Sequence, residues 1–161
     1  MKIQLDYKID IEIQEGNKTK EKLSIFYREF TKAERQDNDA LRKQFEVIFK
    51  KAQKIGKQLT VIDKKISLYE ANSDFDKAID GVLQKEILEE QAYELEEEIN
   101  ALGGGDQIAF NEELSKKRFD TLVSGKDKEK FEEYALIKGY SKLIQELDFT
   151  KAELEKKQSG E

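Results

Sequence analysis

The chain has 161 residues, of which 40% are charged and 37% hydrophobic, and it carries a formal net charge of −6. This acidic balance argues against direct binding of nucleic acid or of anionic membranes, because both need a cationic surface. The chain contains no histidine and no cysteine, which excludes imidazole and thiolate metal sites as well as Ser-His-Asp and Cys-His catalysis. We therefore expect a protein that is not an enzyme and that needs no cofactor.

The distribution of apolar residues predicts one cytoplasmic domain. No signal-peptide-like segment opens the chain and no run approaches 18 consecutive apolar residues, so no membrane span is expected. The strict periodicity described below indicates a folded chain, and its length suits a single domain. We expect residues 1–161 to form one elongated, mainly α domain that opens with a small β-hairpin.

Residues 2–30 are predicted to form this hairpin. From Ile3 to Ile13 every odd residue is apolar and every even one is polar, which is typical of a strand with one buried face. The alternation resumes in EKLSIFYREF, and matching the two apolar faces requires an odd loop, placed at Gly16-Asn17-Lys18. The expected cross-strand pairs are Ile11–Leu23, Ile9–Ile25 and Tyr7–Tyr27 on the apolar face, with Glu12–Lys22 and Asp6–Arg28 on the polar face.

A two-stranded hairpin is marginally stable by itself, so its apolar face must be covered. It can pack on the helices that follow, or one of its edges can accept a strand from another chain. Both alternatives stay open from the sequence.

Residues 31–102 are predicted to form a long antiparallel helical hairpin. Thr31 and Glu34 have the spacing of a capping box, so the first helix should begin near Lys32 and end before Asn72. Gly56 lies beside the seam of this helix and suggests a close contact or a slight bend. Nine apolar residues follow alternating spacings of four and three, which is typical of a coiled-coil seam: Leu41, Phe45, Ile48, Ala52, Ile55, Leu59, Ile62, Ile66 and Tyr69.

The second helix of this hairpin is expected over residues 74–102, with Ser73 and Asp76 at its start. The short connection makes it antiparallel to the first helix. Its seam is predicted as two segments separated by a slip, namely Phe75, Ile79 and Val82, then Leu88, Ala92, Leu95, Ile99 and Leu102. Whether these seams are buried within one chain or between chains is open.

Residues 103–157 are predicted to hold two further helices, and residues 158–161 a frayed tail. GGGD at 103–106 ends the long hairpin, and the third helix should cover residues 111–123. The last helix should begin near Asp127 and present an apolar line at heptad spacing, made of Leu136, Tyr140, Leu143, Leu147 and Leu154.

The two long helices have opposite charge. Residues 31–71 hold ten Lys and Arg against six Asp and Glu, a net charge of +4, whereas residues 74–102 hold two Lys against ten Asp and Glu, a net charge of −8. Flanks of opposite charge favour pairing of these two helices with each other. The excess of glutamates must face water or a cationic partner, so Glu90, Glu94, Glu97 and Glu98 are candidate partner-binding residues. Tyr7 and Tyr27 are further candidates on the hairpin.

The order of the first elements resembles the tail-assembly chaperones of bacteriophages. The resemblance covers about the first 50 residues, in which the hairpin KIQLDYKIDIEIQEGNKTKEKLSIFYREF leads through the cap TKAERQDNDAL into a helical body. It implies a non-catalytic protein that binds a tail protein and self-associates.

The sequence favours a protein-binding assembly factor or adaptor that contacts its partner through the hairpin edge and the acidic helix. One alternative is an anti-defence type inhibitor, whose glutamates would mimic nucleic-acid phosphate in the groove of its target. A second is a purely structural coiled coil, which would self-associate through the hairpin edge or the seam.

Overall fold

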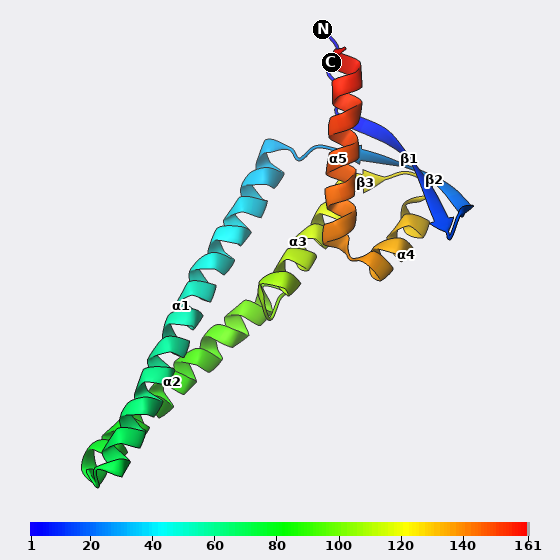
Figure 1. Ribbon diagram of the computed structural model, residues 1–161. Coiled ribbons are helices and arrows are strands. Elements are labelled where there is room, and N and C mark those ends of the chain that lie inside the picture. The colour runs from blue at the N-terminus through cyan, green and yellow to red at the C-terminus, as the bar shows by residue number, and fades with distance from the viewer. Residues whose placement is uncertain (161) are drawn as a thin grey trace. The chain divides into compact units, whose positions relative to one another are not determined.

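The computed structural model describes residues 1–160 and confirms a mainly α fold with an N-terminal β-hairpin (Figure 1). The chain divides into two compact units, one made of residues 1–36 and 108–161 and the other of residues 37–107. The sequence predicted one domain and gave no sign of this division. No helix among the described residues is long and apolar enough to cross a membrane.

Strands β1 (Asp6–Glu15) and β2 (Lys18–Arg28) form the predicted hairpin. All five predicted cross-strand pairs are present, including Ile9 opposite Ile25 and Tyr7 opposite Tyr27. The first strand begins at Asp6, so the prediction was wrong for residues 2–5, where Ile3 is 71% exposed. Alternation alone therefore does not form a strand where no partner strand continues.

The predicted three-residue loop was also wrong. The turn consists of Gly16 and Asn17, and Gly16 has a φ of 64°, which suits the first central position of a two-residue hairpin turn. The pairing shifts after Ile13, so that Lys20 is an extra residue on β2. This β-bulge restores the register that a two-residue turn would otherwise spoil.

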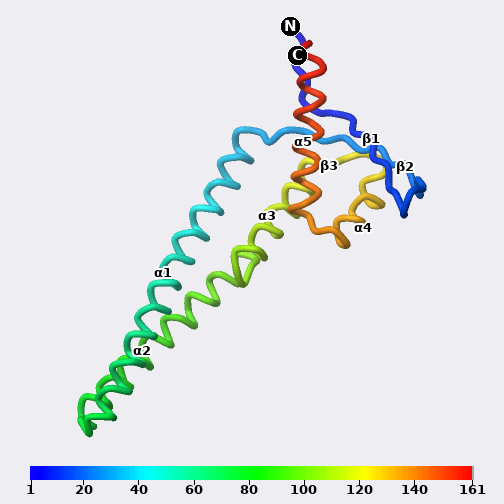
Figure 2. The backbone as a smooth tube through the Cα atoms, viewed as in Figure 1, coloured from blue at the N-terminus to red at the C-terminus, as the bar shows by residue number. Residues whose placement is uncertain are grey.

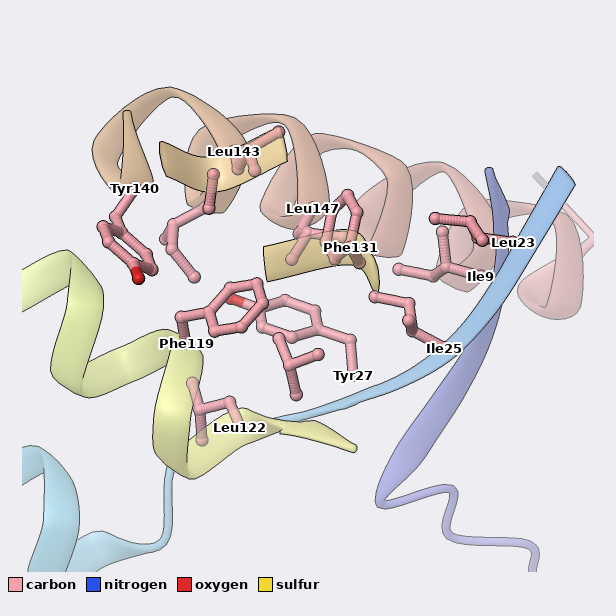
Figure 3. Close-up of a cluster of buried hydrophobic side chains, with 13 residues drawn as sticks. Ile9, Leu23, Ile25, Tyr27, Phe119, Leu122, Phe131, Tyr140, Leu143 and Leu147 are labelled. Carbon is pink, nitrogen blue, oxygen red and sulfur yellow. The ribbon is translucent and has the colours of Figure 1, made fainter. Parts of the chain in front are cut away.

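The core of the first unit lies between the sheet and three helices. These are α3 (Gln107–Leu122), α4 (Lys128–Lys138) and α5 (Tyr140–Ser159), while the short strand β3 (Val123–Ser124) adds to β2 at Tyr27. Figure 3 shows side chains from all these elements converging, with Phe119 between the rings of Phe131 and Tyr140. The hairpin thus packs on helices that follow it in the chain.

The last predicted helix is broken at Gly139, whose φ of 91° ends α4 and begins α5. The Glu112 carboxylate accepts hydrogen bonds from the backbone N–H groups of Tyr140 and Ser141, at 2.9 and 3.1 Å, and thereby satisfies the start of α5. Residues 103–160 therefore hold three helices, where two were predicted. The third helix begins four residues earlier than expected, and α5 continues to Ser159, so the predicted fraying at residues 158–159 was wrong. Glu161 lies outside the described residues.

The second unit consists of most of α1 (Lys32–Ala71) and of α2 (Phe75–Ala101), which run antiparallel (Figures 1 and 2). The capping box is confirmed, because the Glu34 backbone N–H donates to Thr31 Oγ1 and the Thr31 N–H donates to the Glu34 carboxylate. All nine predicted seam residues of α1 are buried or half-buried. The start of α2 is capped by Asp74, which accepts from the Lys77 N–H, so the prediction of Ser73 was wrong.

The predicted seam of α2 was wrong in its first half. The buried and half-buried residues of α2 follow an unbroken 3-4 spacing without a slip: Ala78, Gly81, Lys85, Leu88, Ala92, Leu95 and Ile99. A Cβ atom at Gly81 would lie 2.8 Å from Ile66 Cγ1, so the small residues of α2 allow a close approach to α1. Gly56 has open space around it, and the close contact expected there is absent.

Candidate protein-interaction surfaces

Large apolar residues at the start of α2, three of which were predicted to lie on the seam, form an exposed surface near the turn of the helical hairpin. Phe75, Ile79, Val82 and Leu83 are 62%, 59%, 41% and 54% exposed, and together with Glu70 and Ala78 they line a shallow hollow of about 550 Å³. We call these four residues the tip face. Because Ala78 and Gly81 occupy the inner positions, the larger side chains are rotated away from α1. The tip face is therefore a consequence of the close helix packing.

A second apolar surface, the side groove, lies on the other flank of the same hairpin. Residues such as Gln84 and Gln91 fall on the flank of α2 opposite Val82, as the 3.6-residue helical period requires. Two adjoining hollows of about 540 and 330 Å³ share Lys54 and Gln58. The floor is made of seam residues and of two further apolar side chains, Val61 and Ile87, which are 51% and 58% exposed.

The four predicted glutamates are all exposed, and their spacings of three and four residues place them side by side on one face of α2. Glu94 and Glu98 line the side groove. Glu90 and Glu97 fall seven residues apart on the outermost face of α2. None of the four forms an ion pair within residues 1–160. These four carboxylates are thus available for contacts with a partner.

Tyr7 and Tyr27 were wrongly placed among the partner-contacting residues. Their side chains are 7% and 1% exposed and belong to the interior of the first unit. The Tyr27 hydroxyl donates to Asp148 at 2.6 Å, and Arg118 bonds to both groups. Burial, followed by the hydrogen bond to Asp148, raises the pKa of Tyr27. This network fastens β2 to α3 and α5, which is a structural role.

One edge of the sheet is the unpaired side of β1, because the strand order is β1-β2-β3. A groove of about 500 Å³ runs between this edge and the helices α4 and α5. Ile11 and Ile13 lie along it and are both half-buried. The edge expected from the sequence is therefore present, although the tyrosines are not part of its accessible surface.

Among residues 1–160, no group of three or more acidic side chains is placed to hold a metal ion. The comparisons with known proteins give no family either, since no family model, no curated protein and no solved structure matches the chain. The candidate surfaces therefore have to be judged on their own chemistry.

The tip face is the candidate surface that reasoning from the sequence missed. Phe75, Ile79 and Val82 have seam-like spacing, and this spacing placed them inside. The correcting signal was available, because counting backwards from Leu88 in steps of three and four gives Lys85, Gly81 and Ala78. A search for periodic large apolar residues selects Phe75, Ile79 and Val82 in place of Ala78, Gly81 and Lys85. The two small residues, however, allow the helices to pack more closely.

Proposed function

We propose that the protein is a non-enzymatic interaction protein, an assembly factor or adaptor, that binds another protein through the tip face. The observation that carries this proposal is the exposure of four adjacent large apolar side chains on one turn-proximal surface. Clustered apolar side chains of this kind mark sites of protein association, whereas single exposed apolar residues are ordinary.

Acidic residues lie next to the tip face and indicate the charge that a partner should carry. Glu70 borders the hollow, and Asp76, Asp80 and Glu86 lie within the same turns of α2. A fitting partner presents an apolar patch flanked by Lys or Arg, so that the apolar contact supplies affinity and the charges supply orientation and speed of association. In the resemblance to phage tail-assembly chaperones, this partner is a tail protein.

The proposal is tested by quantitative affinity capture from the source lysate with the full chain and two matched variants. Ile79→Glu places a charge in the tip face. Leu136→Glu makes the same change on α4, where Leu136 is 74% exposed and lies outside the tip face. We expect a specific protein to be lost with Ile79→Glu and retained with Leu136→Glu, and purified partner should then bind the wild type at least 10-fold more tightly than Ile79→Glu. Identical capture by all three forms contradicts the proposal.

The unpaired glutamates of α2 favour a second candidate, an inhibitor that occupies a cationic nucleic-acid groove. This function predicts binding that falls steeply with salt and is lost in Glu90→Gln/Glu97→Gln, whereas Ile79→Glu has little effect. The same capture experiment, washed at low and high salt, therefore separates the two candidates.

A further inference from the structure

The side groove carries charges of opposite sign on its two walls. The α1 wall presents Lys51 and Lys54, and the α2 wall presents Glu94 and Glu98. None of these four side chains forms an ion pair in the part of the chain that the structure describes. On the seam itself, in contrast, Lys85 pairs with Asp63 at 2.8 Å. The charged walls of the groove are therefore available to an incoming surface.

The floor of the groove is incompletely covered. Ile55, Ile62, Leu88 and Leu95 of the seam are only half-buried, because two helices alone cannot enclose the apolar faces between them. Helical hairpins of this kind commonly complete their core by packing on a second helical pair, which gives a four-helix bundle. The groove thus has both an apolar floor to cover and charges to match.

The walls of the side groove are matched at four levels of the hairpin. Val61 lies beside Ile87 in the first hollow, and the second hollow places Lys54 and Gln58 opposite Gln91 and Glu94, with Lys51 near Glu98. These four levels hold an apolar residue on both helices, an amide on both, or a lysine on α1 and a glutamate on α2, whereas Lys57 and Lys65 line the first hollow without a glutamate beside them. A surface with this pattern is complementary to a copy of itself.

We propose that the side groove is the interface of a homodimer, in which a second copy of the hairpin packs on the first as an antiparallel four-helix bundle. A twofold axis parallel to the hairpin places α2 of the second copy over α1 of the first at the same level. Val61 then meets Ile87 of the second copy, and Lys54 meets Glu94 of the second copy. Because the interface is isologous, each of these contacts occurs twice.

The alternative twofold axis, perpendicular to the helices, places α1 over α1 and α2 over α2. It would bring lysines to lysines and glutamates to glutamates, so the charges select the parallel axis. An unrelated helix in the groove would need an acidic flank toward α1 and a basic flank toward α2. The second copy supplies this arrangement from residues already present.

Sedimentation velocity of the full chain with two charge-reversal variants tests the proposal. Lys54→Glu sets two carboxylates against each other at each of these contacts, and Glu94→Lys sets two ammonium groups against each other. We expect the wild type to dimerise and each variant to dimerise about 10-fold or more weakly, because two attractive pairs become repulsive. An equimolar mixture of the two variants forms a heterodimer in which one contact keeps its native pair and the other joins the two reversed side chains. Both contacts are then attractive, so the mixture should dimerise like the wild type.

The mixture is decisive because a change confined to one chain cannot produce this rescue. Lys64→Glu and Glu97→Lys are the matched controls, since they make the same charge changes on exposed positions that do not line the groove, and both should dimerise normally. A monomeric wild type at about 100 μM overturns the proposal, since a stable dimer has a Kd well below that concentration. The proposal is equally overturned if Lys54→Glu and Glu94→Lys each dimerise as tightly as the wild type. It is also overturned if the equimolar mixture of these two variants does not dimerise like the wild type. All these variants leave the tip face intact, so the outcome is independent of the proposed function.

Discussion

The same substitution at two helical glycines should change stability in opposite directions. Gly56 and Gly81 both lie inside long helices, where replacing glycine by alanine ordinarily stabilises by about 1 kcal/mol. Apart from the nearby backbone of its own helix, no atom lies within 4 Å of a Cβ at Gly56, so Gly56→Ala should realise this full gain. At Gly81 the new methyl would lie 2.8 Å from Ile66 Cγ1, which is the inner part of a branched side chain and cannot move away freely.

Overpacking of this kind costs about 1–3 kcal/mol, which exceeds the propensity gain. We therefore expect Gly81→Ala to lower the free energy of unfolding by about 1 kcal/mol, against a rise of about 1 kcal/mol for Gly56→Ala. For a chain of this length each kcal/mol corresponds to roughly 2–4 °C in Tm. Urea unfolding followed by circular dichroism at fixed protein concentration measures both changes.

The Ile66→Ala background isolates the contact. Removing Cγ1 abolishes the clash, so Gly81→Ala introduced into Ile66→Ala should stabilise by about 1 kcal/mol, as at Gly56. If Gly81→Ala stabilises the wild-type chain as much as Gly56→Ala does, the close approach of α1 and α2 at this level is refuted. The outward rotation of the tip face would then need a different cause.

Two further predictions concern the ends of helices. Glu112→Ala removes the acceptor of the Tyr140 and Ser141 N–H groups and should lower the free energy of unfolding by about 1–2 kcal/mol, whereas Glu113→Ala on the next position is the control and should change it little. The hydrogen bonds from Arg28 and from the Thr31 backbone lower the pKa of Glu34 to about 2. Since the folded pKa lies below the unfolded one, Glu34 stabilises the fold above about pH 4.5, and this contribution is lost as the pH falls from about 4.5 to 2. Thermal unfolding across this range should show a smaller decline for Glu34→Gln than for the wild type, and parallel declines would contradict the assignment.

Much of the fold follows from periodicity. The odd and even faces of the first strands determined the hairpin register, because a slip by one residue would expose every apolar side chain. The seam of α1 was equally predictable, since its 3-4 spacing has no competing assignment. In both the paired strands and α1, the apolar residues that carry the period are also buried or half-buried.

The errors occurred where small or polar residues decide the packing. Ala78, Gly81 and Lys85 form the inner face of α2, and periodicity of large side chains does not detect them. The break at Gly139 depends on Glu112, which lies 28 residues earlier than the N–H group of Tyr140 that it binds. Only the three-dimensional contact makes this glycine a helix boundary. The accessible part of the candidate site could not be predicted for the same reason, since exposure depends on which face of α2 meets α1.

The first unit is interrupted in sequence by the second, and this order affects the nascent chain. Tyr27 finds its hydrogen-bond partner Asp148 only 121 residues later, so the apolar face of the hairpin leaves the ribosome long before α3, α4 and α5 exist to cover it. At translation rates of about 5–20 residues per second, this delay is on the order of ten seconds. The helical hairpin of residues 37–107 emerges complete during that interval, and its contacts join residues within this segment. Vectorial synthesis therefore favours an order in which the interior of the chain folds first and its two ends join last.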